Sequence, residues 1–151
     1  MAYTTEEGRT QILDDSAVAV RDLADAVTAL GEAYELLDDD SADRLEALLF
    51  KPLQSGYGHL KRTLTEFAER VGLPARRFEQ PGPGAVEDAW TLLERAADSI
   101  QAAEDGLAEL QDTLLPVEVG DQELRAGLAA VRTTIAPLPE ACDAFLRTLG
   151  R

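Results

Sequence analysis

The chain has 151 residues, a length that suits one domain burying roughly two thirds of its unfolded surface. Its 29 acidic and 14 basic side chains give a formal net charge of −15, which disfavours nucleic acid and anionic membranes as partners. Aromatic residues make up only 5% of a chain that is 45% hydrophobic. The core must therefore consist mainly of Leu, Ala and Val, which is typical of packed helices rather than of a β-sandwich.

The cysteine content and the apolar stretches set expectations about location. Cys142 is the one cysteine, so it cannot form an intramolecular disulfide, and it falls on a predicted core position. No basic N-terminal region precedes an apolar run, and no stretch approaches about 18 uncharged apolar residues. We expect a cytoplasmic location, with neither a signal peptide nor a membrane span.

The first predicted helix covers residues 4–38. Thr4 and Glu7 have the spacing of a capping box. Apolar residues then recur every seventh position in two adjoining rows, Leu13, Val20, Val27 and Tyr34, and Leu23, Leu30 and Leu37. The acidic run 38–40 is unfavourable at a helix C-terminus and favourable before an N-terminus. The chain should turn there, with Asp40 or Ser41 capping the next helix.

The second predicted helix covers residues 41–71, and it has a weak point. Its apolar positions are Leu45, Leu49, Leu53, Tyr57, Leu60, Leu64, Phe67 and Val71. Their spacing is four before Tyr57 and alternates between three and four after it, which indicates a shift of register. A proline inside a helix costs about 3 kcal/mol, and each glycine costs nearly 1 more. Because Pro52, Gly56 and Gly58 coincide with this shift, we expect a kink or local opening at residues 52–58.

The second half of the chain predicts a loop and two further helices. Residues 72–84 contain three glycines and three prolines, which predicts a loop. The third helix, 85–115, carries Val86, Leu93, Ile100, Leu107 and Leu114, flanked by Trp90, Ala97 and Leu110. The fourth, 121–149, places Leu124, Leu128, Val131, Ile135, Leu138, Cys142, Phe145 and Leu149 in one register across Pro137 and Pro139. One kinked helix is the preferred interpretation, and two shorter helices are the alternative.

These four segments have matched lengths, and two of their connections are short. Both features favour one all-α domain over residues 1–151, an antiparallel up-down-up-down four-helix bundle. In this bundle, we expect the second and fourth helices to be kinked at their prolines.

Several chemistries are excluded by counting. A di-metal site in a helical bundle needs Glu-x-x-His twice, and zinc sites need clusters of Cys and His, whereas this chain has a single histidine. The G-x-S-x-G nucleophile motif and the Gly-x-x-x-x-Gly-Lys-Ser/Thr phosphate loop are also missing. We therefore expect no enzymatic activity, no metal and no cofactor.

A charge asymmetry remains as the clearest functional signal. Residues 51–77 carry six basic side chains, Lys51, Lys61, Arg62, Arg70, Arg76 and Arg77, and only two acidic ones. Such a patch can receive an anionic ligand, a phosphorylated group or an acidic partner. The alternative is that these side chains pair with acids on neighbouring helices.

His59 lies beside core position Leu60, where an ordinary surface histidine is one interpretation. The segment His59-Leu60-Lys61-Arg62-Thr63, midway along the second helix, resembles the histidine phosphotransfer domains of bacterial signalling relays. The resemblance implies that His59 accepts phosphate from a phosphorylated aspartate and that Arg62 pairs with it. Thr63 departs from the family's pattern, which has a glycine there.

A third interpretation is a small-molecule pocket near the break at Pro52 to Gly58. It would be lined by Leu53, Tyr57, Ile135, Leu138 and Cys142. The preferred interpretation is a non-enzymatic protein that binds another protein or its own copy, with a homodimer as one form. The candidate binding residues are Lys51, Tyr57, His59, Lys61, Arg62, Arg70, Arg76 and Arg77.

Overall fold

The computed structural model describes residues 4–82, 84 and 86–149, and every regular element among them is helical. The elements are α1 (Thr5–Leu36), α2 (Asp39–Leu45), a π-helical turn η1 (Glu46–Phe50), α3 (Lys51–Arg70), α4 (Ala89–Asp112), α5 (Leu115–Glu118), α6 (Gln122–Ile135) and α7 (Leu138–Leu149). The prediction of an all-α chain is confirmed for these residues.

The ends of α1 follow the capping signals. The Thr4 hydroxyl accepts a hydrogen bond from the Glu7 N–H at 3.1 Å, and the Thr4 N–H donates to the Glu7 carboxylate at 3.4 Å. The predicted capping box is therefore confirmed. At the other end the chain turns within the acidic run, as expected. The cap of α2 is Asp38, which accepts from the Ser41 N–H at 2.8 Å, so the choice of Asp40 or Ser41 as cap was wrong.

The most extensive helix pair is α1 against α4. Alanines recur at every seventh position of α1, at Ala19, Ala26 and Ala33, and buried alanines Ala96 and Ala103 lie on α4. Because small side chains let two helices approach closely, we attribute the extent of this contact to the two alanine rows. These alanine rows were not predicted from the sequence, because the predicted helix faces were defined by the larger apolar residues.

The second predicted helix is continuous from α2 through η1 into α3. The irregular turn is η1, in which the Lys51 N–H bonds to the Glu46 carbonyl, and it precedes Pro52. A wider turn suits the four-residue apolar spacing and relieves the clash between the proline ring and the preceding carbonyl. Residues 52–58 are regular α-helix, so the opening expected there does not occur.

The later helices are shorter than predicted. Asp88 caps α4 by accepting from the Thr91 N–H at 2.7 Å, so this helix begins after the predicted start at residue 85, which itself lies outside the described residues. Leu114 has a φ of 68°, a left-handed conformation that ends the helix region before 115. The fourth segment is two helices, α6 and α7, separated at residues 136–137. The alternative of two shorter helices was therefore the correct one.

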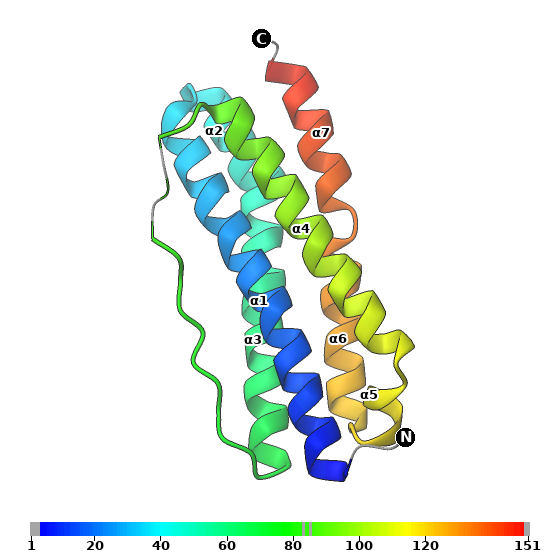
Figure 1. Cartoon of the computed structure of the whole chain (residues 1–151). Helices are drawn as coiled ribbons and strands as arrows, with labels where there is room; N and C mark the ends of the chain where they lie inside the picture. The colour runs from blue at the N-terminus through cyan, green and yellow to red at the C-terminus, as the bar shows by residue number, and fades with distance from the viewer. Residues whose placement is uncertain (1–3, 83, 85, 150–151) are drawn as a thin grey trace.

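The order of directions differs from the prediction. Figure 1 shows that α3 and α4 run in the same direction, because the segment between them returns along the length of α1. Arg76 of this segment pairs with Asp14 of α1 at 2.7 Å. At about 3.3 Å per residue, residues 71–88 can span more than the ~30 Å length of α3. The predicted up-down-up-down order is wrong because the loop after α3, although predicted, is long enough to return to the other end of the bundle.

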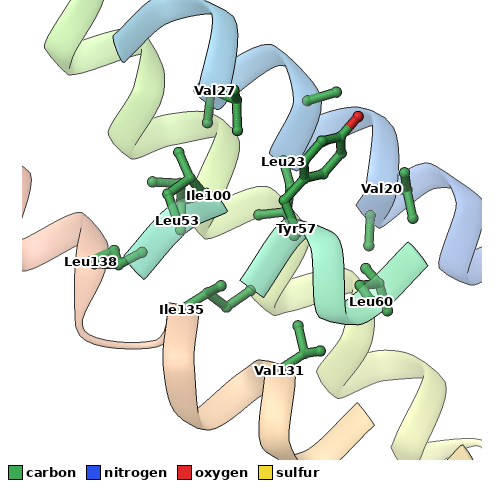
Figure 2. Close-up of a cluster of buried hydrophobic side chains, with 14 of the residues drawn as sticks. Val20, Leu23, Val27, Leu53, Tyr57, Leu60, Ile100, Val131, Ile135 and Leu138 are labelled. Carbon is green, nitrogen blue, oxygen red and sulfur yellow. The ribbon is translucent and has the colours of Figure 1, made fainter. Parts of the chain in front are cut away.

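The helices enclose one hydrophobic core. Figure 2 shows side chains from α1, α3, α4, α6 and α7 meeting in it. Among them Leu23, Leu53, Leu60, Ile100 and Val131 each have 0% exposed surface. The predicted apolar rows thus face one interior, with two exceptions: Val86 and Leu114, predicted for the row of the third helix, are exposed, because they lie outside α4.

Candidate functional site

A groove of about 470 Å³ runs between α3 and α6. It brings together three of the predicted residues, His59, Arg62 and Arg70. The other residues that line it are Thr63, Glu66, Glu123, Ala126, Gly127 and Ala130. This groove is the candidate functional site.

The groove exists because α6 presents small side chains to α3. Gly127 faces Thr63, and a Cβ at position 127 would lie 2.5 Å from the Thr63 side chain. Gly56 of α3 is likewise buried, and a Cβ there would lie 2.8 Å from Ile135. The backbone of α6 at Gly127 therefore packs directly against the Thr63 side chain of α3. On the solvent side of this contact, the side chains of Ala126 and Ala130 are too short to fill the space between the helices, and this space is the groove.

Arg70 ties the C-terminal end of α3 to the N-terminal end of α6. Its guanidinium donates two hydrogen bonds to the Asp121 carboxylate, at 2.7 and 2.9 Å, and lies 3.6 Å from Glu123. The bond from Arg70, together with one from the Leu124 N–H, holds the pKa of Asp121 below its usual value. Arg70 thus pairs with an acidic residue at the start of the neighbouring helix, and we call this pair the Arg70–Asp121 clamp. For Arg70, the alternative that the basic side chains pair with acids on neighbouring helices is the correct one.

His59 and Arg62 differ from Arg70 in this respect. Among the described residues, neither side chain makes a hydrogen bond or an ion pair. Arg62 is exposed and His59 is half-buried, and one Arg62 nitrogen lies 3.2 Å from where a Cβ of Gly58 would be. Two basic side chains in the groove therefore remain available to a ligand or a partner.

The other predicted basic residues lie on different surfaces. Arg76 pairs with Asp14 and fastens the 71–88 connection to α1. Arg77 lines a separate hollow with Arg21 and Glu79. The six basic residues of the sequence patch do not form one surface, since the chain between α3 and α4 carries two of them away from the groove.

Lys51, Tyr57 and Lys61 complete the predicted set. Lys51 is exposed at the start of α3, where no described residue forms an ion pair with it. Tyr57 is 6% exposed and points toward α1 beside Leu23 (Figure 2). The Lys61 ammonium lies 4.0 Å from the centroid of the Tyr57 ring, so Lys61 covers the α1 side of α3 rather than the groove.

The residues of the predicted apolar pocket are packed in the core. Leu53, Ile135 and Leu138 lie close to one another there (Figure 2). Cys142 is fully buried, and this burial raises the pKa of its thiol to about 12. Their burial is explained by core packing and gives no support to a ligand site at this place.

Sequence reasoning missed the α6 side of the groove. Its small residues, Ala126, Gly127 and Ala130, were passed over because they belong to no row of large apolar side chains. The signal was present, since small residues three and four positions apart on a helix mark a close approach to a neighbour. Glu123 was also missed.

Comparisons with known proteins give no assignment. No known protein family, curated protein or solved structure matches this chain. Within the described residues, no group of three or more His, Cys, Asp or Glu side chains is placed to hold a metal ion. No helix in that part of the chain is long and apolar enough to cross a membrane.

Proposed function

We propose that this protein is a non-enzymatic, cytoplasmic helical bundle that binds another protein through one exposed surface, the α3–α6 face. The residues of the face are Lys51, His59, Arg62, Glu66 and Glu69 on α3, and Glu123, Ala126, Ala129 and Thr133 on α6. One observation carries the proposal. In a chain of net charge −15, this face presents Lys51, His59 and Arg62 without partners among the described residues, beside an alanine-rich wall.

The shape and rigidity of the face support docking. Ala126 and Ala129 are exposed on α6, and short side chains allow an incoming helix or strand to lie close to the backbone. The Arg70–Asp121 clamp and the contact of Gly127 with Thr63 hold the two helices in place. A partner therefore meets a surface that is already ordered, which lowers the entropy lost on binding.

Site-specific photo-crosslinking tests the proposal. A photoreactive residue replaces Ala129 on the face in one variant and Ala102, an exposed alanine of α4, in the matched control. After illumination in cells, we expect a discrete heavier product from position 129 and none from position 102. Adding Arg62→Glu to the Ala129 variant should remove the product. Equal labelling at the two positions, or none at position 129, would contradict the proposal.

A second candidate function is phosphotransfer at His59. It is favoured by the placement of His59 and Arg62 in one groove. Thr63, which also lines this groove, is only 7% exposed and packs against Gly127. An imidazole nitrogen of His59 would attack the phosphorus of a phosphoaspartate, forming an N–P bond. The P–O bond breaks, and the aspartate leaves as a carboxylate while Arg62 stabilises the transferred charge.

The two candidates are separated by a labelling experiment. The protein is incubated with a response-regulator domain carrying a labelled phosphoaspartate, and acid-labile label on the protein is measured. Phosphotransfer requires label on the wild-type chain and none on His59→Gln, with slower labelling of Arg62→Gln. An unlabelled wild-type chain would remove this candidate and leave the docking proposal in place.

A further inference from the structure

We propose that the partner of the α3–α6 face is a second copy of this chain, docked antiparallel across a two-fold axis. This inference rests on the proposed function, because it names the molecule that the face binds. It follows from the distribution of charge along α3, from the level at which α6 packs against α3, and from the side chains near the midpoint of the face.

The exposed side of α3 changes sign along its length. Lys51, His59 and Arg62 lie in the first two thirds of the helix, and Glu66 and Glu69 lie in the last third. Arg70 does not reverse this, because it is paired with Asp121 of the same chain. The face is therefore basic at one end and acidic at the other.

The neighbouring helix extends the same pattern. Gly127 lies at the level of Thr63, and Gly56 lies at the level of Ile135, so α6 runs antiparallel to α3. This places Glu123, near the start of α6, at the acidic end of the face. The basic end is bordered by uncharged residues at the C-terminal end of α6, Thr133 and Ala136, which are both exposed.

A face with this polarity is complementary to itself in one orientation. A two-fold axis that crosses α3 near its midpoint, Leu60, sets α3 antiparallel on α3 of the second copy. Lys51 then faces Glu69 of the second copy, and the same contact recurs at the symmetry-related position. A parallel arrangement would set like charges against each other, which is unfavourable.

The side chains near the axis decide how closely the two copies approach. Gly58 and Arg62 are equally distant from Leu60 in sequence, so Arg62 faces Gly58 of the second copy, beside that copy's own Arg62, which lies 3.2 Å from where a Cβ of Gly58 would be. Because the two Arg62 side chains repel each other, they must turn outward to solvent in the dimer. On α6 the axis passes near Ala130, the residue whose level matches Leu60, and exposed Ala129 lies beside it. Small residues at the centre of a symmetric helical interface allow the backbones to approach.

The area of the face sets the expected affinity of the dimer. α3 has 20 residues and α6 has 14, so they are about 30 Å and about 21 Å long, and each is about 10 Å wide. Together they offer roughly 500 Å² per copy, or about 1,000 Å² in all, which is at the low end for specific interfaces. We therefore expect a dimer that dissociates on dilution.

Sedimentation velocity over a range of concentrations tests the inference on the full chain. The wild-type protein should pass from monomer to dimer as concentration rises. Lys51→Glu and Glu69→Lys should each weaken dimerisation by about tenfold or more, because two attractive contacts become repulsive in the symmetric pair. The double variant Lys51→Glu/Glu69→Lys should recover wild-type affinity to within about threefold. The control Glu94→Lys changes an exposed charge on α4 and should leave the affinity no weaker.

The outcomes are decisive in each case. A wild-type chain that stays monomeric overturns the inference, and so does a dimer whose affinity ignores the swaps or is not restored in the double variant. Circular dichroism of each variant verifies that it is folded. If the chain is monomeric but position 129 crosslinks a different protein, the proposed function stands without this inference. If it is monomeric and position 129 yields no product, both fail.

Discussion

Gly127 of α6 lies so close to Thr63 of α3 that a Cβ at position 127 would come within 2.5 Å of both the Oγ1 and the Cγ2 atoms of the threonine. This contact sets the spacing of the two helices, because neither partner can be enlarged without moving the other. The floor of the groove, and hence the arrangement of His59 and Arg62 above it, depends on this one missing side chain.

Gly127→Ala should therefore destabilise the protein. Overpacking of a tight helix contact costs about 1–3 kcal/mol, which outweighs the gain of about 0.5–1 kcal/mol from replacing a helical glycine by alanine. We expect the melting temperature to fall by several degrees, since about 1 kcal/mol corresponds to roughly 2–4 °C at this chain length.

Two further variants separate packing from helix propensity. Gly106 lies within α4, where an added Cβ meets nothing within 4 Å, so Gly106→Ala should raise the melting temperature. Thr63→Ala added to Gly127→Ala should restore much of the lost stability, because it removes both atoms of the clash. A Gly127→Ala variant as stable as Gly106→Ala would show that the helices are not in close contact.

The Arg70–Asp121 clamp predicts a pH dependence. The folded pKa of Asp121 is lowered by its bond from Arg70, so the clamp is present above the unfolded pKa of about 3.9 and is lost as the pH falls through the folded pKa. Asp121→Asn keeps a helix cap but removes the charge. At pH 7 it should lower the free energy of unfolding by about 0.5–1 kcal/mol.

Urea unfolding at several pH values measures this effect. The difference between wild type and Asp121→Asn should narrow as the pH falls below about 3.9, where the carboxylate becomes protonated in the unfolded chain, and should be lost once the pH passes the lower folded pKa of Asp121. Arg70→Gln should show the same pattern. A difference that stays constant from neutral to acidic pH would mean that the two side chains are not paired in solution.

Cys142 should be inert in the folded protein. Burial raises its pKa to about 12, and the thiolate is the reactive form. Titration with a thiol reagent at pH 8 should give almost no reaction without denaturant and one thiol per chain in denaturant. In Ser55→Cys, which adds an exposed site on α3, one thiol should react at once. Rapid labelling of the wild-type thiol would place Cys142 outside the core.

The salt bridge between Arg76 and Asp14 should protect the segment that follows α3 from proteolysis. Arg76 and Asp14 are 32% and 52% exposed at their side chains, so their pairing contributes at most about 1 kcal/mol. Asp14→Asn should speed tryptic cleavage after Arg77 by about two- to fivefold, because the segment opens more often. Mass spectrometry follows the cleavage, and Asp98→Asn on α4 is the control. Unchanged cleavage in Asp14→Asn would argue that the tether does not hold the segment.

Local features of this fold were predictable from sequence. The capping box at Thr4 and Glu7 and the turn in the acidic run depend on neighbours only a few residues apart. The hydrogen bonds of the capping box form as expected, and the chain turns where predicted, although the cap is Asp38 rather than Asp40 or Ser41. The apolar rows also identified buried residues correctly, as at Leu60 and Val131. Burial on one side of a helix leaves a periodic pattern that is readable without the tertiary structure.

Features that depend on distant segments were not predictable. The segment after α3 lies along α1, where Arg76 pairs with Asp14 and Phe78 packs against the core, and the composition of a loop does not give its direction. Pro52 indicated an irregular helix, but the irregular turn, η1, lies one turn before the proline. The wider turn keeps Leu49 and Leu53 buried. Likewise, Arg62 and Arg70 look equivalent in sequence, and only the position of Asp121 distinguishes them.

The central claim is that the α3–α6 face makes the functional contact, and NMR of the single histidine tests it most directly. His59 lies in the groove and Trp90 lies on α4, and the chain has one of each, so each gives one side-chain signal. On raising the protein concentration from about 10 µM to about 1 mM, a range that spans weak dimers, the His59 ring signals should shift or broaden while the Trp90 indole signal stays in place. A His59 signal that remains unchanged, both over this range and after addition of any protein captured at position 129, would contradict the account.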